Sequence, residues 1–252
     1  MIQDSSLAVF YLCRVADPNW KFLALRFLSS YLKYLPGSDH VLYVIYKGVS
    51  NNHAAEEAEE IFKSIKSNKI FVDDDGYDIG AYIKIANLVN EKYVLFLNSY
   101  SQILSNNWLY KMRLHLNQDN IKLVGASASY ESLDVYPGFP KFPNPHIRTN
   151  GFLIERELFV DLTRDISIKD KMDAMLFESG NNSLTRLILK VGDVCIVGRN
   201  GRSYCIDLWP ESNVFKCGLQ ENLLISDNQT DAYLSAPYFK KQFLLKKTWY
   251  WG

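Results

Sequence analysis

The chain has 252 residues, of which 48% are hydrophobic, so it is long enough to bury one full core and its length favours a single large domain. Lys and Arg together number 28, as do Asp and Glu, and this balance argues against a nucleic-acid partner. Four cysteines lie far apart without CxxC spacing, which argues against a disulfide scaffold. The first apolar run is too short for a signal peptide or a membrane span, so we expect a cytoplasmic protein.

Short apolar runs alternate with helical patterns from residue 7 to about residue 129, a rhythm typical of βαβ units with a parallel sheet. Strands are expected at 8–13, 40–48, 69–72 and 93–98. Helices are expected at 19–35, 54–65 and 79–90, with Pro36-Gly37 ending the first of them. The predicted fold class is therefore α/β, with a mainly parallel central sheet flanked by helices.

The second half continues with a helix at 108–116, a strand at 122–127 and a Pro-rich loop at 136–145. A strand followed by a helix is expected in 146–162, then a helix at 183–189 and a strand at 194–198. From residue 204 the pattern becomes irregular. We therefore divide the chain into a main domain, 1–203, and a C-terminal extension, 204–252, packed on the same domain.

Polar residues follow three of the predicted strands, where ligands bind in open parallel sheets. Arg14, Val15, Ala16 and Asp17 follow the first strand, DDDGYDIGA (73–81) the third, and Asn98-Ser99-Tyr100-Ser101 the fourth. The 73–81 turn combines four carboxylates with two glycines, which suits a close approach of phosphate or ribose to a helix N-terminus. An alternative is that Asp75 and Asp78 only cap the next helix.

The segment 76–104, GYDIGAYIKIANLVNEKYVLFLNSYSQIL, resembles the central part of GT-A-type, family 2-like glycosyltransferases of bacterial surface-polysaccharide synthesis. The resemblance spans about residues 7–162 and implies a Rossmann-like GT-A fold. A second stretch, residues 177–204 and 209–233, resembles the C-terminal part of a narrower group of polysaccharide glycosyltransferases. The resemblance implies transfer of a sugar from a nucleotide-sugar donor to a glycan or lipid-linked acceptor, in O-antigen, lipopolysaccharide or capsule synthesis.

One departure from the family pattern concerns the metal. Where the family carries an acidic D-x-D motif, this chain has Asn98-Ser99-Tyr100, which offers no carboxylate to a hard cation. We therefore expect no metal site; the alternative, that the 73–78 carboxylates bind Mn²⁺ or Mg²⁺, stays open. Without a metal the leaving diphosphate needs other positive charge, and Arg199 and Arg202 follow a predicted strand.

The predicted roles fall into three groups. The donor-binding residues are Arg14, Ala16, Asp75, Asp78, Gly80, Asn98, Ser99, Arg199 and Arg202. The acceptor-binding residues are His146, Arg148, Asn150 and Trp209. Glu178 is the predicted general base, expected at a helix N-terminus, with Asp207, Glu211 and Asp227 as alternatives.

Two other function classes remain open: a catalytically inactive nucleotide- or carbohydrate-binding module of the same fold, and a metal-dependent nucleotidyltransferase. The last segment, 238–251, interleaves lysines with aromatic residues, which suits peripheral contact with the anionic inner face of a membrane. The alternative is that its rings pack on the domain.

Overall fold

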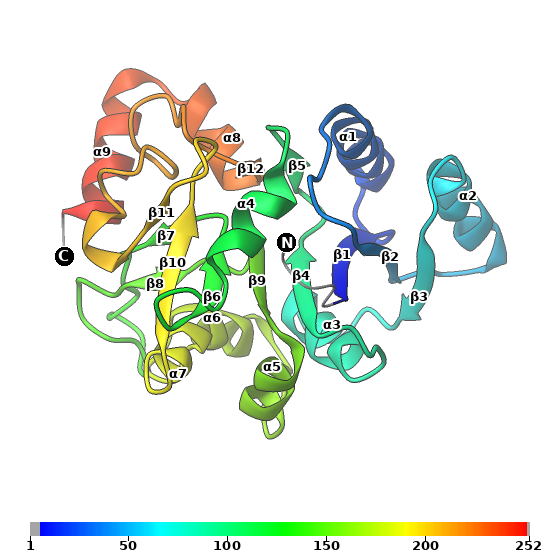
Figure 1. Ribbon diagram of the computed structural model, residues 1–252, viewed down its shortest axis with the longest axis horizontal. Helices are drawn as coiled ribbons and strands as arrows, with labels where there is room; N and C mark the ends of the chain where they lie inside the picture. The colour runs from blue at the N-terminus through cyan, green and yellow to red at the C-terminus, as the bar shows by residue number, and fades with distance from the viewer. Residues whose placement is uncertain (1–5, 251–252) are drawn as a thin grey trace.

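The computed structural model describes residues 6–250, and these form an eight-stranded sheet with helices on both faces (Figure 1). The strand order is β11-β10-β6-β9-β4-β1-β2-β3. The strands are β1 (Leu7–Arg14), β2 (Val41–Lys47), β3 (Asn68–Val72), β4 (Tyr93–Leu97), β6 (Ile121–Gly125), β9 (Gly151–Glu155), β10 (Asp193–Val197) and β11 (Ser203–Tyr204). The order and the flanking helices define an α/β, Rossmann-like fold.

Strand direction fixes where the loops meet. Strands β4, β1, β2 and β3 pair in parallel, as do β6 and β10. Strand β9 is antiparallel to both β4 and β6, so these two point the same way. The carboxyl ends of all six of these parallel strands therefore lie along one edge of the sheet. The predicted mainly parallel sheet is confirmed, with β9 and the short β11 as its antiparallel members.

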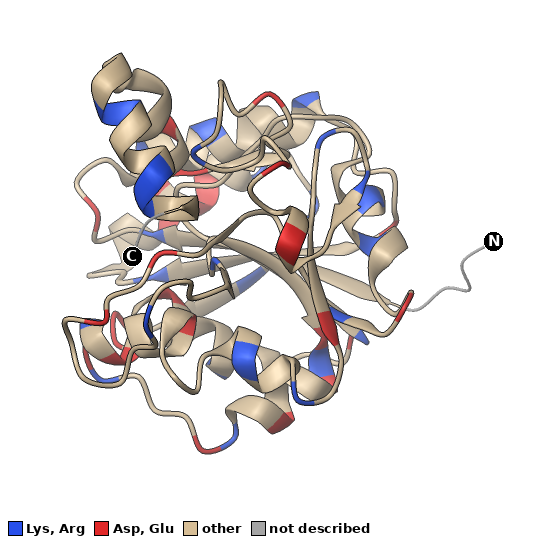
Figure 2. Ribbon diagram, turned by 90° about the vertical axis from the view of Figure 1, so that its left-hand side faces the viewer, with Lys and Arg blue, Asp and Glu red and all other residues tan. Residues whose placement is uncertain are grey.

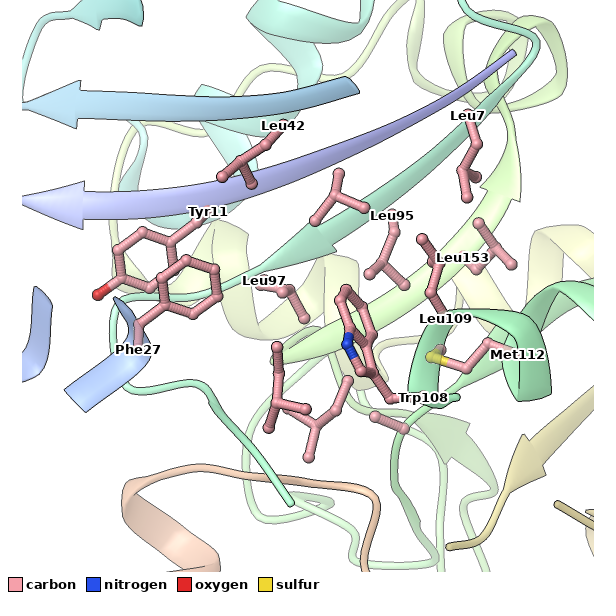
Figure 3. Packing of buried hydrophobic residues seen from close by; sticks show 14 of the residues in the cluster. Leu7, Tyr11, Phe27, Leu42, Leu95, Leu97, Trp108, Leu109, Met112 and Leu153 are labelled. Carbon is pink, nitrogen blue, oxygen red and sulfur yellow. The ribbon is translucent and has the colours of Figure 1, made fainter. Parts of the chain in front are cut away.

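Side-chain alternation along β1 divides the core into two layers. Tyr11 and its i±2 neighbours face one layer with α1 (Trp20–Lys33), α2 (Asn52–Phe62) and α4 (Trp108–His115), while Phe10 faces the other. Figure 3 shows the first layer, where Phe27 stacks on Tyr11 with ring centroids 3.7 Å apart and Trp108 lies among the leucines. The opposite layer holds α3 (Tyr77–Ala86), α5 (Arg156–Thr163), α6 (Lys171–Ser179) and α7 (Leu184–Ile188).

The expected irregular tail is wrong for much of its length, because two helices, α8 (Asn228–Ser235) and α9 (Tyr238–Trp249), end the described chain. Asp227 begins α8 through a capping box, in which its carboxylate accepts from the Thr230 amide at 2.9 Å. Helix α9 packs back on the domain, where Trp249 Nε1 donates to the Phe215 carbonyl at 2.9 Å. No helix within residues 6–250 is long and apolar enough to cross a membrane.

Two short strand pairings and a 3-10 turn complete the topology. Strand β5 (Gln102–Ile103) pairs with β12 (Ile225–Ser226) just before α8, and β7 (Ala128–Ser129) pairs with β8 (His146–Ile147). A 3-10 turn, η1 (Ile206–Leu208), follows β11. The β12–β5 pair brings the start of α8 next to the loop after β4, so a C-terminal element reaches the edge of the sheet where the predicted ligand-binding loops lie.

Candidate functional site

A cavity of about 710 Å³ lies at the carboxyl edge of the sheet. Its walls come from the ends of β1 and β2, the turn after β3 and the loop after β4, together with the starts of α6 and α8. Five of the predicted donor-binding residues line it: Arg14, Asp75, Asp78, Asn98 and Ser99. These five residues come from the ends of three different strands, β1, β3 and β4, and meet in one concave, charged site, as expected for a parallel sheet.

A larger hollow of about 1150 Å³ lies beside the edge strand β3 and shares only the acidic turn with this cavity. Its walls combine apolar side chains such as Phe71 and Leu88 with the amides of Asn51, Asn52 and Asn87. The smaller cavity gathers charged groups from several strand ends, and for that reason we assign the candidate site there.

The turn after β3 is shaped by glycine. Gly76 adopts φ +66°, and a Cβ at this position would lie 2.9 Å from the Gly80 Cα. The Gly80 amide donates to the Gly76 carbonyl at 2.6 Å, which closes the first turn of α3. Gly80 therefore supports the turn from behind and does not line the cavity. Ala16 is exposed beside the site and also does not line it.

Two cations hold the acidic turn in place. Arg14 donates two parallel hydrogen bonds to Asp74, at 2.8 Å to Oδ1 and 2.6 Å to Oδ2, and it also contacts Asp17. The Arg14 guanidinium lowers the pKa of Asp74. Lys47 is only 1% exposed, and its Nζ donates to the Asp73 carbonyl at 3.0 Å and to the Asp75 carbonyl. Burial lowers the pKa of Lys47.

The carboxylates of the turn are not equivalent. Asp74 pairs with Arg14, and Asp75 pairs with Lys84 at 2.7 Å. Asp78 has no ion pair within residues 6–250, and burial of its carboxyl group, followed by the charge of Glu178, raises its pKa to about 6. Asp78 is thus the acid of this cavity whose protonation changes close to neutral pH.

Glu178 does not lie where the sequence analysis places it. It is the penultimate residue of α6, so the expected position at a helix N-terminus is wrong. The error has a physical origin, because Asp170 and Asp173 form a capping box that starts this helix earlier in the chain. The Glu178 carboxylate accepts from the Thr149 amide at 3.3 Å and is not among the residues that line the cavity.

The loop after β4 presents Ser99 and Tyr100 to the cavity through a local turn. The Asn98 side-chain oxygen accepts from the Tyr100 amide and from Ser101 Oγ, each at 3.1 Å. The backbone N–H of Asn98 donates to the backbone carbonyl of Asn150 at 3.2 Å. Asn98 therefore organises the loop at the position where the related motif carries an acid.

The cations of the cavity that have no ion pair within residues 6–250 are two lysines that the sequence analysis does not predict. Lys169 and Lys171 line it, are exposed, and have no ion pair within residues 6–250. Arg199 and Arg202, which were expected there, are exposed beyond β10 and do not line the cavity, because β6 and β9 separate β10 from β4. Lys47 also lines the cavity and was not predicted to do so. Its position at the end of the predicted second strand could have indicated this, because ligands bind beyond strand ends.

The predicted acceptor residues are mostly buried. Arg148 is 5% exposed and forms an ion pair with Asp227 at 2.7 Å, and its guanidinium lies 4.2 Å from the centre of the Phe215 ring. Trp209 is fully buried and donates to the Tyr204 carbonyl, so its ring is not presented to an acceptor. We correct both assignments to structural roles.

His146 and Asn150, which lie two residues before and after Arg148 in the sequence, are also buried. His146 Nδ1 lies 2.8 Å from the Asn144 carbonyl, and burial lowers the pKa of this imidazole. The Asn150 side-chain oxygen accepts from Ser127 Oγ at 3.0 Å. Neither residue lines the cavity. Their side chains bond within the protein, which makes them poor candidates for direct contact with an acceptor.

The cavity was also considered as a metal site, because carboxylates are the ligands that hard cations prefer. Across residues 6–250, no three His, Cys, Asp or Glu side chains are grouped so that they could hold a metal ion. Asp74 and Asp75, two consecutive acids that line the cavity, are compensated by Arg14 and Lys84.

Comparisons with known proteins give the fold. No family model and no curated protein sequence matches the chain. Among solved structures, a 4-diphosphocytidyl-2C-methyl-D-erythritol synthase from Anaerococcus prevotii superposes with a TM-score of 0.51 and 12% identity, covering 77% of this chain and 89% of that one. At this identity the likeness shows the fold alone, and it agrees with the α/β, Rossmann-like architecture described above.

Two further structures are less similar. Mouse xyloside xylosyltransferase 1 has a TM-score of 0.44 and 10% identity, covering 71% of this chain and 79% of that one. A cytidylyltransferase from Leptospira borgpetersenii has a TM-score of 0.43 and 17% identity, covering 65% of each chain.

Proposed function

We propose that this protein is a glycosyltransferase that moves a sugar from a nucleotide-sugar donor to a glycan or lipid-linked acceptor. The observation that carries the proposal is the cavity at the carboxyl edge of β1, β2 and β4, with its paired acids and its two lysines. A role in surface-polysaccharide synthesis rests on the sequence resemblance of residues 76–104.

In this proposal the nucleotide lies along the strand ends. Asp17 and the acidic turn offer acceptors to ribose hydroxyls and base donors, while Tyr77 and Tyr100 offer aromatic surface. Lys169 and Lys171 face the diphosphate, whose negative charge grows as the sugar leaves. Donor binding is proposed to be independent of a divalent metal, because Asn98 stands where an acid is expected and Asp74 and Asp75 are already paired.

The acceptor hydroxyl needs a group that takes its proton. Asp78 lines the cavity and its pKa of about 6 suits that step near neutral pH, whereas Glu178 lies behind it and raises the pKa of Asp78 through its charge. We therefore propose Asp78 as the base and Glu178 as a positioning residue that keeps Asp78 basic. Asp78→Asn and Glu178→Gln both preserve shape, so comparing them identifies the base.

Loss of a general base lowers turnover by about 10² to 10⁴. We expect Asp78→Asn to show that loss at all pH values, whereas Glu178→Gln should shift the pH profile to lower pH and keep most of its activity. The reverse pattern would assign the base to Glu178, as the sequence analysis does.

Nucleotidyl transfer is a second candidate, and the likeness in fold to the Anaerococcus synthase favours it. Such a reaction uses a nucleoside triphosphate and releases pyrophosphate. A protein that lost turnover but kept the fold would bind nucleotide and do neither reaction.

The test is a thermal-shift screen of the full chain against UDP-, GDP-, CMP- and dTDP-sugars, with Mn²⁺ or with EDTA. A ligand at 100 times its Kd raises stability by about 2.7 kcal/mol, which is easily measured. Stabilisation in EDTA followed by transfer or donor hydrolysis supports the proposal. Binding only with Mn²⁺ overturns the metal-independent part, and pyrophosphate release from a nucleoside triphosphate assigns the second candidate.

A further inference from the structure

Helix α9 presents an aromatic stripe to solvent. Phe239 is 75% exposed, Phe243 is 49% exposed, and Tyr250, which directly follows the helix, is 64% exposed. With about 100° between successive helical residues, these three side chains fall within about 40° of one another. The opposite side of the helix packs on the protein, where Thr248 and Trp249 are buried.

Lysines flank this stripe on both sides. By the same helical rotation, Lys246 lies beside Phe239 on one side, and Lys240 and Lys247 lie beyond Phe243 on the other. Lys247 pairs with Glu131 at 3.1 Å, whereas Lys240 and Lys246 have no ion pair within residues 6–250. The helix contains no Asp or Glu. Figure 2 faces the side of the molecule that carries α9, with Lys and Arg in blue.

A second exposed apolar stripe, on α1, shows what is particular to α9. Phe22, Leu25 and Leu32 are 64%, 53% and 58% exposed. The lysines next to this stripe in the sequence are Lys21, which pairs with Glu57, and Lys33, which has no ion pair within residues 6–250 and lies 5.0 Å from the centre of the Tyr34 ring. Within residues 6–250 the α9 stripe groups three exposed rings with two lysines that have no ion pair, whereas the α1 stripe has a single exposed ring, Phe22, and one such lysine. Exposed rings next to unpaired lysines favour a partner that offers both negative charge and an apolar layer, and they do not favour a neutral protein surface.

We propose that the outer face of α9 lies on the surface of an anionic lipid bilayer. This outer face consists of Phe239, Lys240, Phe243, Lys246, Lys247 and Tyr250. The rings enter the boundary between headgroups and acyl chains, and the flanking lysines contact acidic headgroups. The helix lies along the bilayer without crossing it. Trp251, part of the segment expected to contact membrane, lies outside the described residues.

The proposal concerns a surface and does not depend on the reaction. Helix α8 joins it to the cavity, because Asn228 at the start of α8 lines the cavity and only residues 236–237 separate α8 from α9. Docking through α9 would therefore hold the cavity near the bilayer. If the proposed glycosyltransferase activity is also correct, a lipid-linked acceptor lies within its reach.

Flotation of the full-length protein with vesicles tests this surface. We expect flotation with phosphatidylcholine vesicles that contain phosphatidylglycerol, no flotation with phosphatidylcholine alone, and a decrease as salt is raised. Each lysine near the headgroups is worth roughly fivefold in partitioning, so Lys240→Glu with Lys246→Glu should lower it at least 25-fold. Phe239→Ser should lower it as well, without a change in salt dependence.

The matched control is Phe22→Ser, which removes a ring that is 64% exposed from the α1 stripe and should float like the unchanged protein. Circular dichroism and a thermal melt of each variant establish that it is folded. Absence of flotation with anionic vesicles at low salt overturns the proposal. So does equal flotation of the lysine variants, or a loss in Phe22→Ser as large as that in Phe239→Ser. Self-association that the α9 substitutions abolish, without lipid binding, assigns the face to a second copy of the chain.

Discussion

Three of the charged residues that line the cavity differ from the buried ion pair between Arg148, just after β8, and Asp227, just before α8, in how they are compensated. In the first region Asp78, Lys169 and Lys171 line a cavity and have no ion pair within residues 6–250. In the second, Arg148 and Asp227 are 5% and 0% exposed and pair with each other. Similar residue types thus line a candidate ligand site in one place and pair with each other inside the fold in the other.

The difference shows that burial with a partner, and not residue type, separates the two roles. A buried ion pair loses hydration on both sides and has no charge left for a ligand. An exposed lysine that faces a cavity keeps its charge available at little cost to the fold. Substitutions in the two regions should therefore separate effects on stability from effects on binding.

The largest expected effect is on stability, at Arg148. Arg148→Met removes one partner of a buried ion pair and leaves Asp227 uncompensated, which typically costs about 3–5 kcal/mol of unfolding free energy. Urea denaturation measures this loss. Arg199→Met, at an exposed site, is the control and should stay within about 0.5 kcal/mol. Equal stability of the two variants would show that Arg148 is not structural.

The sequence predicts the parallel half of the molecule well because its signals are local. Strand β1 is a continuous apolar run whose alternate residues face both core layers, and Pro36-Gly37 follows α1. The same rule, that ligands lie beyond strand ends, selects five residues that do line the cavity. Lys47 was within reach of that rule, since it ends β2 at the same edge.

The remaining residues depend on long-range packing. Nothing local to Arg148 shows that Asp227, 79 positions later, will neutralise it. Glu178 was misplaced because α6 starts at a capping box that the pattern of apolar residues did not reveal. Lys169 and Lys171 precede and begin that helix, and their position at the cavity follows only once α6 is placed beside α3.

The second effect tests whether Asp78 belongs to the site or to the fold. Its pKa of 3.8 in the unfolded chain rises to about 6 in the folded protein, so folding favours the protonated form. Below pH 3.8 the carboxyl group is protonated in both states and does not affect the free energy of unfolding. As the pH rises from 3.8 through 6, ionisation in the unfolded chain is favoured and the protein loses stability. At about 1.4 kcal/mol per pKa unit, the loss reaches up to about 3 kcal/mol at neutral pH.

Asp78→Asn removes this ionisation, so the variant should be more stable than the unchanged protein at pH 7.5, with the gain disappearing near pH 4. Urea unfolding at both pH values measures the gain. Asp75→Asn provides the control, because that carboxylate is 65% exposed and should show little change. If Asp78→Asn instead lowered stability at pH 7.5, the carboxylate would be a structural acceptor.

The third effect is smaller and concerns the support of the acidic turn. Lys47→Met keeps the aliphatic stem but removes the ammonium that donates to the Asp73 and Asp75 carbonyls, which should cost about 1–2 kcal/mol of stability. Affinity for a nucleotide should fall as well, because the turn loses its anchor. Calorimetric titration and a thermal melt measure the two effects. An unchanged affinity would show that the turn does not contact the nucleotide.

The smallest expected effect is on binding alone and gives the sharpest contrast between the regions. Lys169→Ala with Lys171→Ala removes two exposed cations from the cavity, so the Kd for a nucleoside diphosphate should rise roughly fivefold to tenfold at low salt. The melting temperature should hardly change, since neither lysine has an ion pair within residues 6–250. Raising the salt concentration should shrink the difference, because screening weakens exposed charges.

Arg199→Ala with Arg202→Ala is the matched pair, with the same charge change on the same edge of the sheet but outside the cavity. Its affinity should equal that of the unchanged protein, because neither arginine lines the cavity and the two lysines that do are retained. A loss of affinity only in the arginine pair would move the anion site toward β10, where the sequence analysis expects it. A loss only in the lysine pair would locate it between α6 and the strand ends, because that is where the unpaired charge faces a cavity.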